Sequence, residues 1–165
     1  RTRARARATV DAMIEYQRTS ELAAPAEVVW AHATSMAGVN AELRPWLRMT
    51  APRGVDLQPR TIDSYRFAFH SWLLLGGMLP VDRHSLGFEA MTPEQFCFHE
   101  RSSSWLQREW VHRRSIEPIE RGCRLTDRVT CVPRLRVAER VTRRIVRAVF
   151  DHRHTVLQTL FGRPG

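Results

Sequence analysis

The last part of the chain carries an apolar repeat that limits the fold more strongly than any other feature. Between residues 136 and 161, apolar residues recur every three or four positions, the period of an α-helix with one buried face. The repeat consists of Val137, Val141, Ile145, Val149, His152, Val156 and Leu160, with Val146, Phe150, Leu157 and Phe161 beside it. The pattern predicts one helix of about 26 residues, about 39 Å long. Gly162 and Pro164 are expected to end it.

Two histidines near the end of this helix, His152 and His154, follow Asp151 and raise the question of a metal site. Residues two apart on a helix point about 200° away from each other, so both cannot bind one ion. We expect His152, which lies in the repeat, to face inward, partly buried with one hydrogen-bond partner. His154 and Asp151 should lie off the repeat. No metal site is therefore predicted.

The preceding sequence favours strands, with short helices near the start. Alternation predicts a first strand over 12–22, followed by a helix over 25–36 that Gly38 interrupts and a second helical turn that ends near Pro45. Residues 48–62 are expected to form a loop that can hold one short strand. The segment 64–80 is ambiguous between helix and strand. Further strands are predicted over residues 81–91, 95–102, 105–118 and 123–133.

Length and composition indicate one domain over 12–165, preceded by a mobile basic tail over 1–11. The 165 residues include five Trp and seven Phe, enough large apolar side chains for a core or a lined cavity. Cys97, Cys123 and Cys131 show no metal-binding spacing and are interpreted as reduced thiols of a cytoplasmic protein.

No secretory signal or membrane-spanning run is visible.

The charge of the chain is strongly positive and comes entirely from arginine. The net charge is +9, which suggests an anionic partner such as nucleic acid or an anionic membrane surface. The tail over 1–11 and the helical segment 136–147 would carry such an interaction. An arginine-rich soluble face explains the same charge more simply, so a nucleic-acid or membrane partner is not favoured.

The two strands before the final helix place polar residues on a face that is otherwise apolar. The first strand presents Leu106, Arg108, Trp110, His112, Arg114 and Ile116, and the second presents Leu125, Asp127, Val129 and Cys131. A plain half-buried sheet should be apolar throughout its inner face. These charged residues therefore need partners inside the fold.

A hairpin centred between Ile119 and Glu120 would pair Trp110 with Val129, His112 with Asp127, and Arg114 with Leu125. A shift of two residues would instead place Arg114 opposite Asp127, on the same face. The preceding strand carries Phe96, Phe98 and Glu100 on one face, so Glu100 can join the group. Three interpretations stay open: a structural network, the polar end of a ligand pocket, or an acid–base pair.

The order of these elements resembles the START-like, or SRPBCC, superfamily of helix-grip proteins. The resemblance extends from about residue 13 to 162. Its marks are RTSELAAPAEVVWAH, FHERSSSW, REWVHRRSIEP, GCRLTDRVT and VFDHRHTVLQTLF. It implies an α+β fold in which a curved antiparallel sheet of six or seven strands surrounds the long C-terminal helix, with short helices after the first strand and an apolar cavity between sheet and helix. Members bind lipids, sterols, polyketides or other hydrophobic molecules, and some are polyketide aromatases or cyclases.

We therefore expect a protein that binds a small hydrophobic molecule, without a cofactor. The expected apolar contacts are Trp72, Leu74, Met78, Phe88, Phe98, Trp110 and Val129, and the expected polar contacts are Glu100, His112, Arg114 and Asp127. The alternative is a cyclase-, aromatase- or dehydratase-like enzyme in which His112 works with Asp127 or Glu100 as general acid and base.

Overall fold

The computed structural model describes residues 13–53 and 60–164. The basic tail predicted over 1–11 lies outside these residues, as does part of the predicted loop over 48–62.

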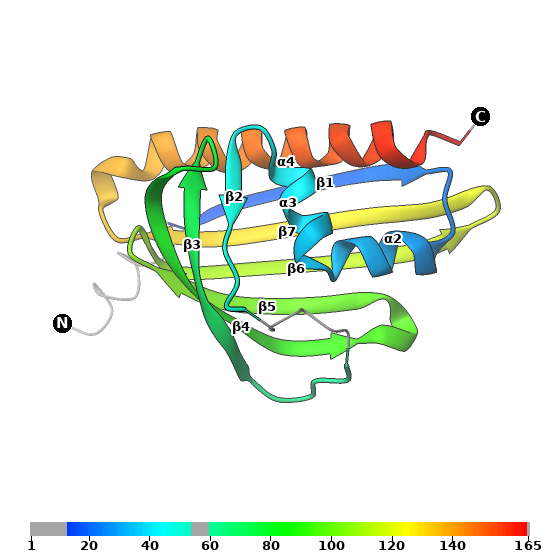
Figure 1. Cartoon of the computed structure of the whole chain (residues 1–165), viewed down its shortest axis with the longest axis horizontal. Coiled ribbons are helices and arrows are strands. Elements are labelled where there is room, and N and C mark those ends of the chain that lie inside the picture. The colour runs from blue at the N-terminus through cyan, green and yellow to red at the C-terminus, as the bar shows by residue number, and fades with distance from the viewer. Residues whose placement is uncertain (1–12, 54–59, 165) are drawn as a thin grey trace.

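One curved antiparallel sheet holds the long C-terminal helix, α4 (Glu139–Phe161), along one side (Figure 1). The strands are β1 (Ile14–Leu22), β2 (Leu47–Met49), β3 (Arg66–Leu75), β4 (Leu79–Thr92), β5 (Cys97–Ser104), β6 (Gln107–Ile119) and β7 (Gly122–Pro133). They lie in the order β1-β7-β6-β5-β4-β3-β2. This is the helix-grip arrangement, so the predicted fold class is confirmed.

The strands predicted from alternation are present with small shifts at their ends. The ambiguous segment 64–80 is mostly strand. It contains β3, the start of β4 and the tight turn at Gly76 and Gly77 that joins them. Both glycines have positive φ angles, 60° and 78°, which other residues rarely adopt. Pro93–Gln95 forms a short 3-10 helix, η1, between β4 and β5.

Two short helices, α2 (Ala26–Ala33) and α3 (Met36–Leu43), follow β1 as predicted. The predicted break at Gly38 is wrong, since Gly38 lies inside α3. The chain turns at Ser35, whose hydroxyl oxygen caps α3 by accepting a hydrogen bond from the Gly38 amide at 3.0 Å. A Cβ atom at Gly38 would lie 1.9 Å from the His32 carbonyl oxygen, so glycine permits the close approach of the two helices.

Helix α4 starts slightly later than predicted, after the short 3-10 helix η2 (Arg136–Ala138), and it ends at Gly162 as expected. Its buried face is only one side of the predicted stripe, the side that holds Val146, Phe150 and Leu157. The residues that it buries are Val146, Phe150, Arg153, His154 and Leu157. Several members of the predicted repeat, including Val141, Ile145 and Leu160, are exposed. Helix α4 packs chiefly beside β1, and this position selects a face rotated from the most apolar one.

The core has two parts, and each contains one of the two fully buried cysteines. Cys123 packs in the larger cluster, which includes Trp30, Phe98 and Leu157. Cys131 packs in the smaller cluster with Phe150. All three cysteines are unpaired, and burial raises the pKa of the Cys123 and Cys131 thiols to about 11. Both therefore behave as small apolar side chains rather than as nucleophiles.

Candidate functional site

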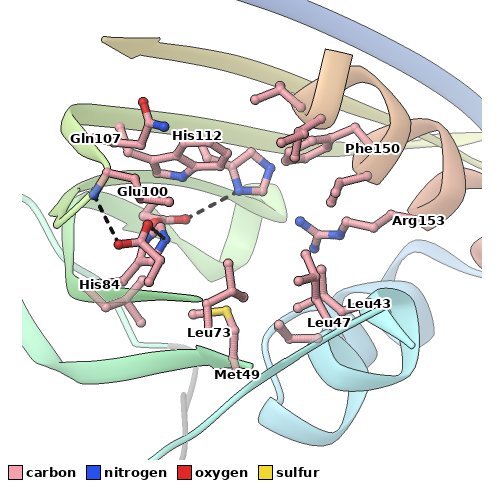
Figure 2. Close-up of a pocket in the computed structure, with 18 of the residues that line it drawn as sticks. Leu43, Leu47, Met49, Leu73, His84, Glu100, Gln107, His112, Phe150 and Arg153 are labelled. Atoms are coloured by element: carbon pink, nitrogen blue, oxygen red, sulfur yellow. Dashed lines mark hydrogen bonds and ion pairs between the residues drawn. The ribbon is translucent and has the colours of Figure 1, made fainter. Parts of the chain in front are cut away.

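A cavity of about 390 Å³ lies between the sheet, α3, β2 and α4 (Figure 2). This volume is within the range of small-molecule pockets, roughly 300–1,000 Å³. The sheet contributes Leu86, Phe88, Phe98 and Trp110, α3 contributes Met36, Val39 and Leu43, β2 contributes Leu47 and Met49, and α4 contributes Val141, Ile145, Val149 and Phe150. The walls are thus mostly apolar.

Polar side chains gather on the sheet side of the cavity, on β4, β5 and β6. Glu100 accepts a hydrogen bond from the Ser102 hydroxyl at 2.7 Å, and its other oxygen lies 3.4 Å from His112 Nδ1. His84 lies 3.3 Å from Asp82, which also accepts a hydrogen bond from the Leu106 amide. Gln107 lines the cavity as well, and its buried Oε1 has no hydrogen-bond partner among residues 13–53 and 60–164.

Behind this wall, the β6–β7 hairpin has the shifted register, with Arg114 opposite Asp127 and His112 opposite Val129. The turn centred between Ile119 and Glu120 is wrong by one residue, because Ile119 pairs with Gly122. Gly122 has a φ of 134°, and a Cβ there would lie 2.0 Å from the Leu22 carbonyl oxygen. Only glycine fits at position 122 next to β1, and this requirement sets the position of the β6–β7 turn in the chain. His112 still reaches Asp127 diagonally, at 2.7 Å from Nε2 to Oδ1.

Arg114 is the centre of a buried ionic network. Its Nε and Nη2 donate to the two Asp127 oxygens at 2.7 Å, and its Nη1 and Nη2 donate to Glu42 at 3.1 and 3.0 Å. Arg153 donates to Glu42 from α4, with Nε at 2.8 Å from Oε2. The network therefore joins α3, α4, β6 and β7 through paired, charge-assisted hydrogen bonds.

The buried carboxyl groups stay ionised because they face cations. Burial alone would raise the pKa of Asp127, but Arg114 and His112 hold it well below its usual value. In the same way, Arg114 and Arg153 outweigh burial and lower the pKa of Glu42. Burial would also raise the pKa of Glu100, but the hydrogen bond and charge of His112 and the hydrogen bond from Ser102 lower it. The cavity wall thus presents an anionic carboxylate.

His112 connects the network to the cavity. One ring nitrogen faces Asp127 and the other faces Glu100, and both ionised carboxylates can only accept hydrogen bonds. A neutral ring can donate to one of them, and an imidazolium can donate to both. His112 therefore links the buried ionic network to the Glu100 carboxylate at the cavity wall.

Of the two histidines of α4, His154 departs from the expected position and His152 keeps it. His154 is fully buried, with Nε2 hydrogen-bonded to Asp127 at 3.1 Å and Nδ1 hydrogen-bonded to the Ser20 hydroxyl at 2.9 Å. The prediction that it lies off the buried face is wrong, because Asp127 provides it with an interior partner. His152 is partly buried and bonds the Arg44 carbonyl oxygen, as predicted, but it stacks on Trp46 at the surface side. Asp151 lies off the buried face, as expected, and accepts from Tyr16.

The structure divides the expected ligand contacts into three groups. Those that line the cavity are Phe88, Phe98, Glu100, Trp110 and His112. Arg114, Asp127 and Val129 are buried but do not line it. Trp72, Leu74 and Met78 do not line it either, because the β3 residue that faces inward is Leu73 and Met78 lies exposed in the β3–β4 turn. The structure thus separates these three residues from the cavity.

The sequence reasoning missed several residues of the site, above all Glu42, Arg153, Asp82, His84 and Gln107. Asp82 and His84 fall on the same strand face as Leu86 and Phe88, a signal like the one used for His112 and Asp127. Gln107, followed by Arg108 and Glu109, gives no comparable signal. Glu42 has no such signal. It lies 72 residues from Arg114 in the chain, and only the packing of α3 brings the two together.

None of the helices in residues 13–53 and 60–164 is long and apolar enough to cross a membrane. In the same part of the chain, no group of three or more His, Cys, Asp or Glu side chains is arranged to hold a metal ion.

Comparisons with known proteins agree with this architecture. A family model described as "Domain of unknown function (DUF8410)" matches residues 20–161. No curated protein matches the sequence. Among solved structures, protein CV1439 from Chromobacterium violaceum superimposes with a TM-score of 0.65 at 12% identity, covering 90% of this chain and 98% of that one.

Two further solved structures carry descriptive names. The Zhui aromatase/cyclase from Streptomyces sp. R1128 gives a TM-score of 0.59 at 13% identity, over 87% of this chain and 88% of that one. A START superfamily protein from Mycobacterium smegmatis gives 0.58 at 13% identity, over 90% and 96%. At these identities the similarity concerns the fold, which is START-like.

Proposed function

Because the chain belongs to the DUF8410 family and has the START-like helix-grip fold, we propose that it binds a small hydrophobic molecule between the sheet and α4. The observation that carries the proposal is the cavity of about 390 Å³, whose walls are mostly leucine, methionine, valine and aromatic side chains. An unfilled apolar space of this size forfeits packing contacts, and a bound apolar molecule would restore them.

The polar residues of the cavity restrict the class of ligand. Glu100 lines the cavity, and its lowered pKa keeps it ionised, so it presents a hydrogen-bond acceptor to the ligand. A hydroxyl or amide group would donate to the Glu100 oxygens, whereas a carboxylate or phosphate group beside them would be repelled. The two arginines of the lining, Arg134 and Arg153, already donate to the Ser104 carbonyl oxygen and to Glu42. The proposed ligand is an uncharged apolar metabolite, such as a lipid or polyketide fragment, with at least one hydrogen-bond donor.

The proposal is tested by titrating the purified protein with a neutral environment-sensitive dye and then displacing the dye with a panel of apolar alcohols and phenols. The variant Val149→Trp fills the cavity from α4 and should weaken dye binding at least tenfold, because it removes the space. Leu160→Trp, on the exposed part of the same helix, is the matched control and should bind as the wild type does. Equal binding by wild type and Val149→Trp would place the dye elsewhere and count against the proposal.

A second candidate is a cyclase- or dehydratase-like enzyme that uses the same cavity. The observation that favours it is the position of His112 between Asp127 and Glu100, with the ring facing the cavity. Such an imidazole can pass a proton to or from a bound molecule while Asp127 orients it. His112→Gln should then abolish turnover of an identified substrate while keeping ligand affinity within a fewfold. Unchanged turnover would exclude this role for His112.

A further inference from the structure

The end of the molecule where α4 begins carries an exposed apolar surface around the cavity. We define the apolar rim as Trp105, Leu106, Leu135, Val141 and Ile145, all of which line the cavity. Their exposed fractions are 61, 52, 66, 58 and 54%, respectively. The apolar lining of the cavity thus continues onto the protein surface at the rim.

The rim is continuous although its residues come from three segments. Figure 1 shows the β5–β6 turn, the end of β7 and the start of α4 together at the left end of the molecule. The Arg134 amide donates to the Leu106 carbonyl oxygen at 2.9 Å, which ties the β7–α4 connection to the β5–β6 turn. Trp105 packs edge-to-face on Trp72 at 5.0 Å, which extends the surface towards β3. Exposed apolar surface gathered at one end usually marks an interaction site.

Cationic side chains surround the apolar rim. Residues 134–147 contain six arginines and one acidic residue, Glu139, which pairs with Arg143. All six arginines are exposed. Arg140 and Arg144 each precede a rim residue of α4, so they lie about 100° around the helix from Val141 and Ile145. The first half of α4 therefore presents an apolar row beside a cationic row.

We propose that this end of the molecule docks onto an anionic lipid surface, with the apolar rim inserted among the headgroups and the arginines against the lipid phosphates. A helix with one apolar and one arginine-rich face lies in the membrane interface for this reason, and tryptophan favours the same depth. Each cationic residue near such a surface contributes attraction that falls with added salt.

The other partners fit these observations less well. A symmetric contact between two copies would bring the same patch, with its six arginines, against itself. Nucleic acid would use the arginines but would leave the apolar rim exposed to water. Docking on a bilayer buries the rim and neutralises the arginines together. It also lets an apolar ligand pass between bilayer and cavity without crossing water. The docking itself does not depend on the ligand proposed above.

Flotation with vesicles tests the docking directly. Wild-type protein should float with phosphatidylcholine vesicles that contain phosphatidylglycerol, far less with pure phosphatidylcholine, and less as salt increases. The double variant Val141→Glu/Ile145→Glu should bind the anionic vesicles at least tenfold more weakly. Arg140→Gln/Arg144→Gln should weaken binding by roughly tenfold or more, because two interfacial charges are lost.

Leu160→Glu provides the matched control, since Leu160 is 53% exposed at the opposite end of the same helix and should tolerate glutamate without effect on flotation. All variants keep residues 1–12, so differences between them report on the rim. Circular dichroism checks their folding, and Val141→Ser/Ile145→Ser replaces the glutamate variant if it is misfolded. The proposal is wrong if rim variants bind like wild type, or if neutral vesicles bind equally well. It is also wrong if sedimentation shows a dimer that the rim variants disrupt.

Discussion

At the residue scale, the buried charges of this protein are acceptable because each has a partner of opposite sign. Arg114 contacts Asp127 and Glu42 through both edges of its guanidinium, and all three side chains are fully buried. Removing one member would leave its partners charged in an apolar interior, which costs more than the intact pair contributes. Substitution of any one of these three residues is therefore expected to destabilise the fold.

Arg114→Leu should lower the free energy of unfolding by about 3–5 kcal/mol, because Glu42 and Asp127 lose their main cation. Chemical denaturation of the variant and the wild type measures this. The matched control is Arg124→Leu, which removes an arginine from the neighbouring strand β7 that is paired with Glu21 at the surface. Its effect should be much smaller. An equal decrease in the free energy of unfolding in the two variants would show that the buried network contributes no more than a surface ion pair.

The lowered pKa values of Asp127 and Glu42 predict how stability depends on pH. A carboxyl whose folded pKa is depressed contributes stability above its unfolded pKa of about 4, and this contribution is lost as the pH falls through the folded value. Stability should therefore decline from about pH 5 downward. Asp127→Asn should be less stable at pH 7 and show a flatter profile between about pH 5 and 3. Denaturation midpoints across this range provide the measurement, and parallel profiles would contradict the assignment.

At the element scale, close backbone contacts decide details that side-chain patterns do not show. Gly38 allows α2 and α3 to meet, and Gly122 allows the β6–β7 turn to lie against β1. In both places the sequence shows only a glycine, which was interpreted as a helix break in the first case. Alternation of polar and apolar residues did predict β1 and the strands from β4 to β7, and the 3.6-residue repeat did predict α4, because both patterns are local. Alternation left the segment that forms β3 ambiguous.

Gly38→Ala should destabilise the protein by about 2 kcal/mol or more, although alanine is the better helix former, because its Cβ would meet the His32 carbonyl oxygen. Thermal denaturation followed by circular dichroism measures the effect. Ala37→Gly, at the neighbouring exposed position of the same helix, should cost no more than about 1 kcal/mol. A stabilised Gly38→Ala variant would rule out the steric explanation.

At the scale of the whole molecule, the cavity separates the sheet from the first half of α4, so a ligand adds contacts between parts of the fold that otherwise lie apart. A ligand that binds only the folded state stabilises it by about 2.7 kcal/mol at a concentration one hundred times the dissociation constant. The expected rise in Tm is then roughly 5–10 °C.

Val149→Trp should lose this ligand-dependent rise in Tm, because the indole occupies the ligand's space. Scanning calorimetry with and without a displacing ligand from the panel checks both statements. Leu160→Trp should keep the full rise. A rise that survives in Val149→Trp would assign the stabilisation to binding outside the cavity.

The sequence by itself determined the order of elements, the sheet of antiparallel strands, the long final helix and the proximity of His112, Arg114 and Asp127. These follow from patterns within a strand, a helix or one hairpin, where chain geometry fixes which residues share a face. The tertiary structure alone decided the partner of Arg114 on α3, the buried position of His154 and the exclusion of Trp72, Leu74 and Met78 from the cavity. It also decided which face of α4 is buried. Each of these depends on how distant segments pack, and packing forces act only once those segments are in contact.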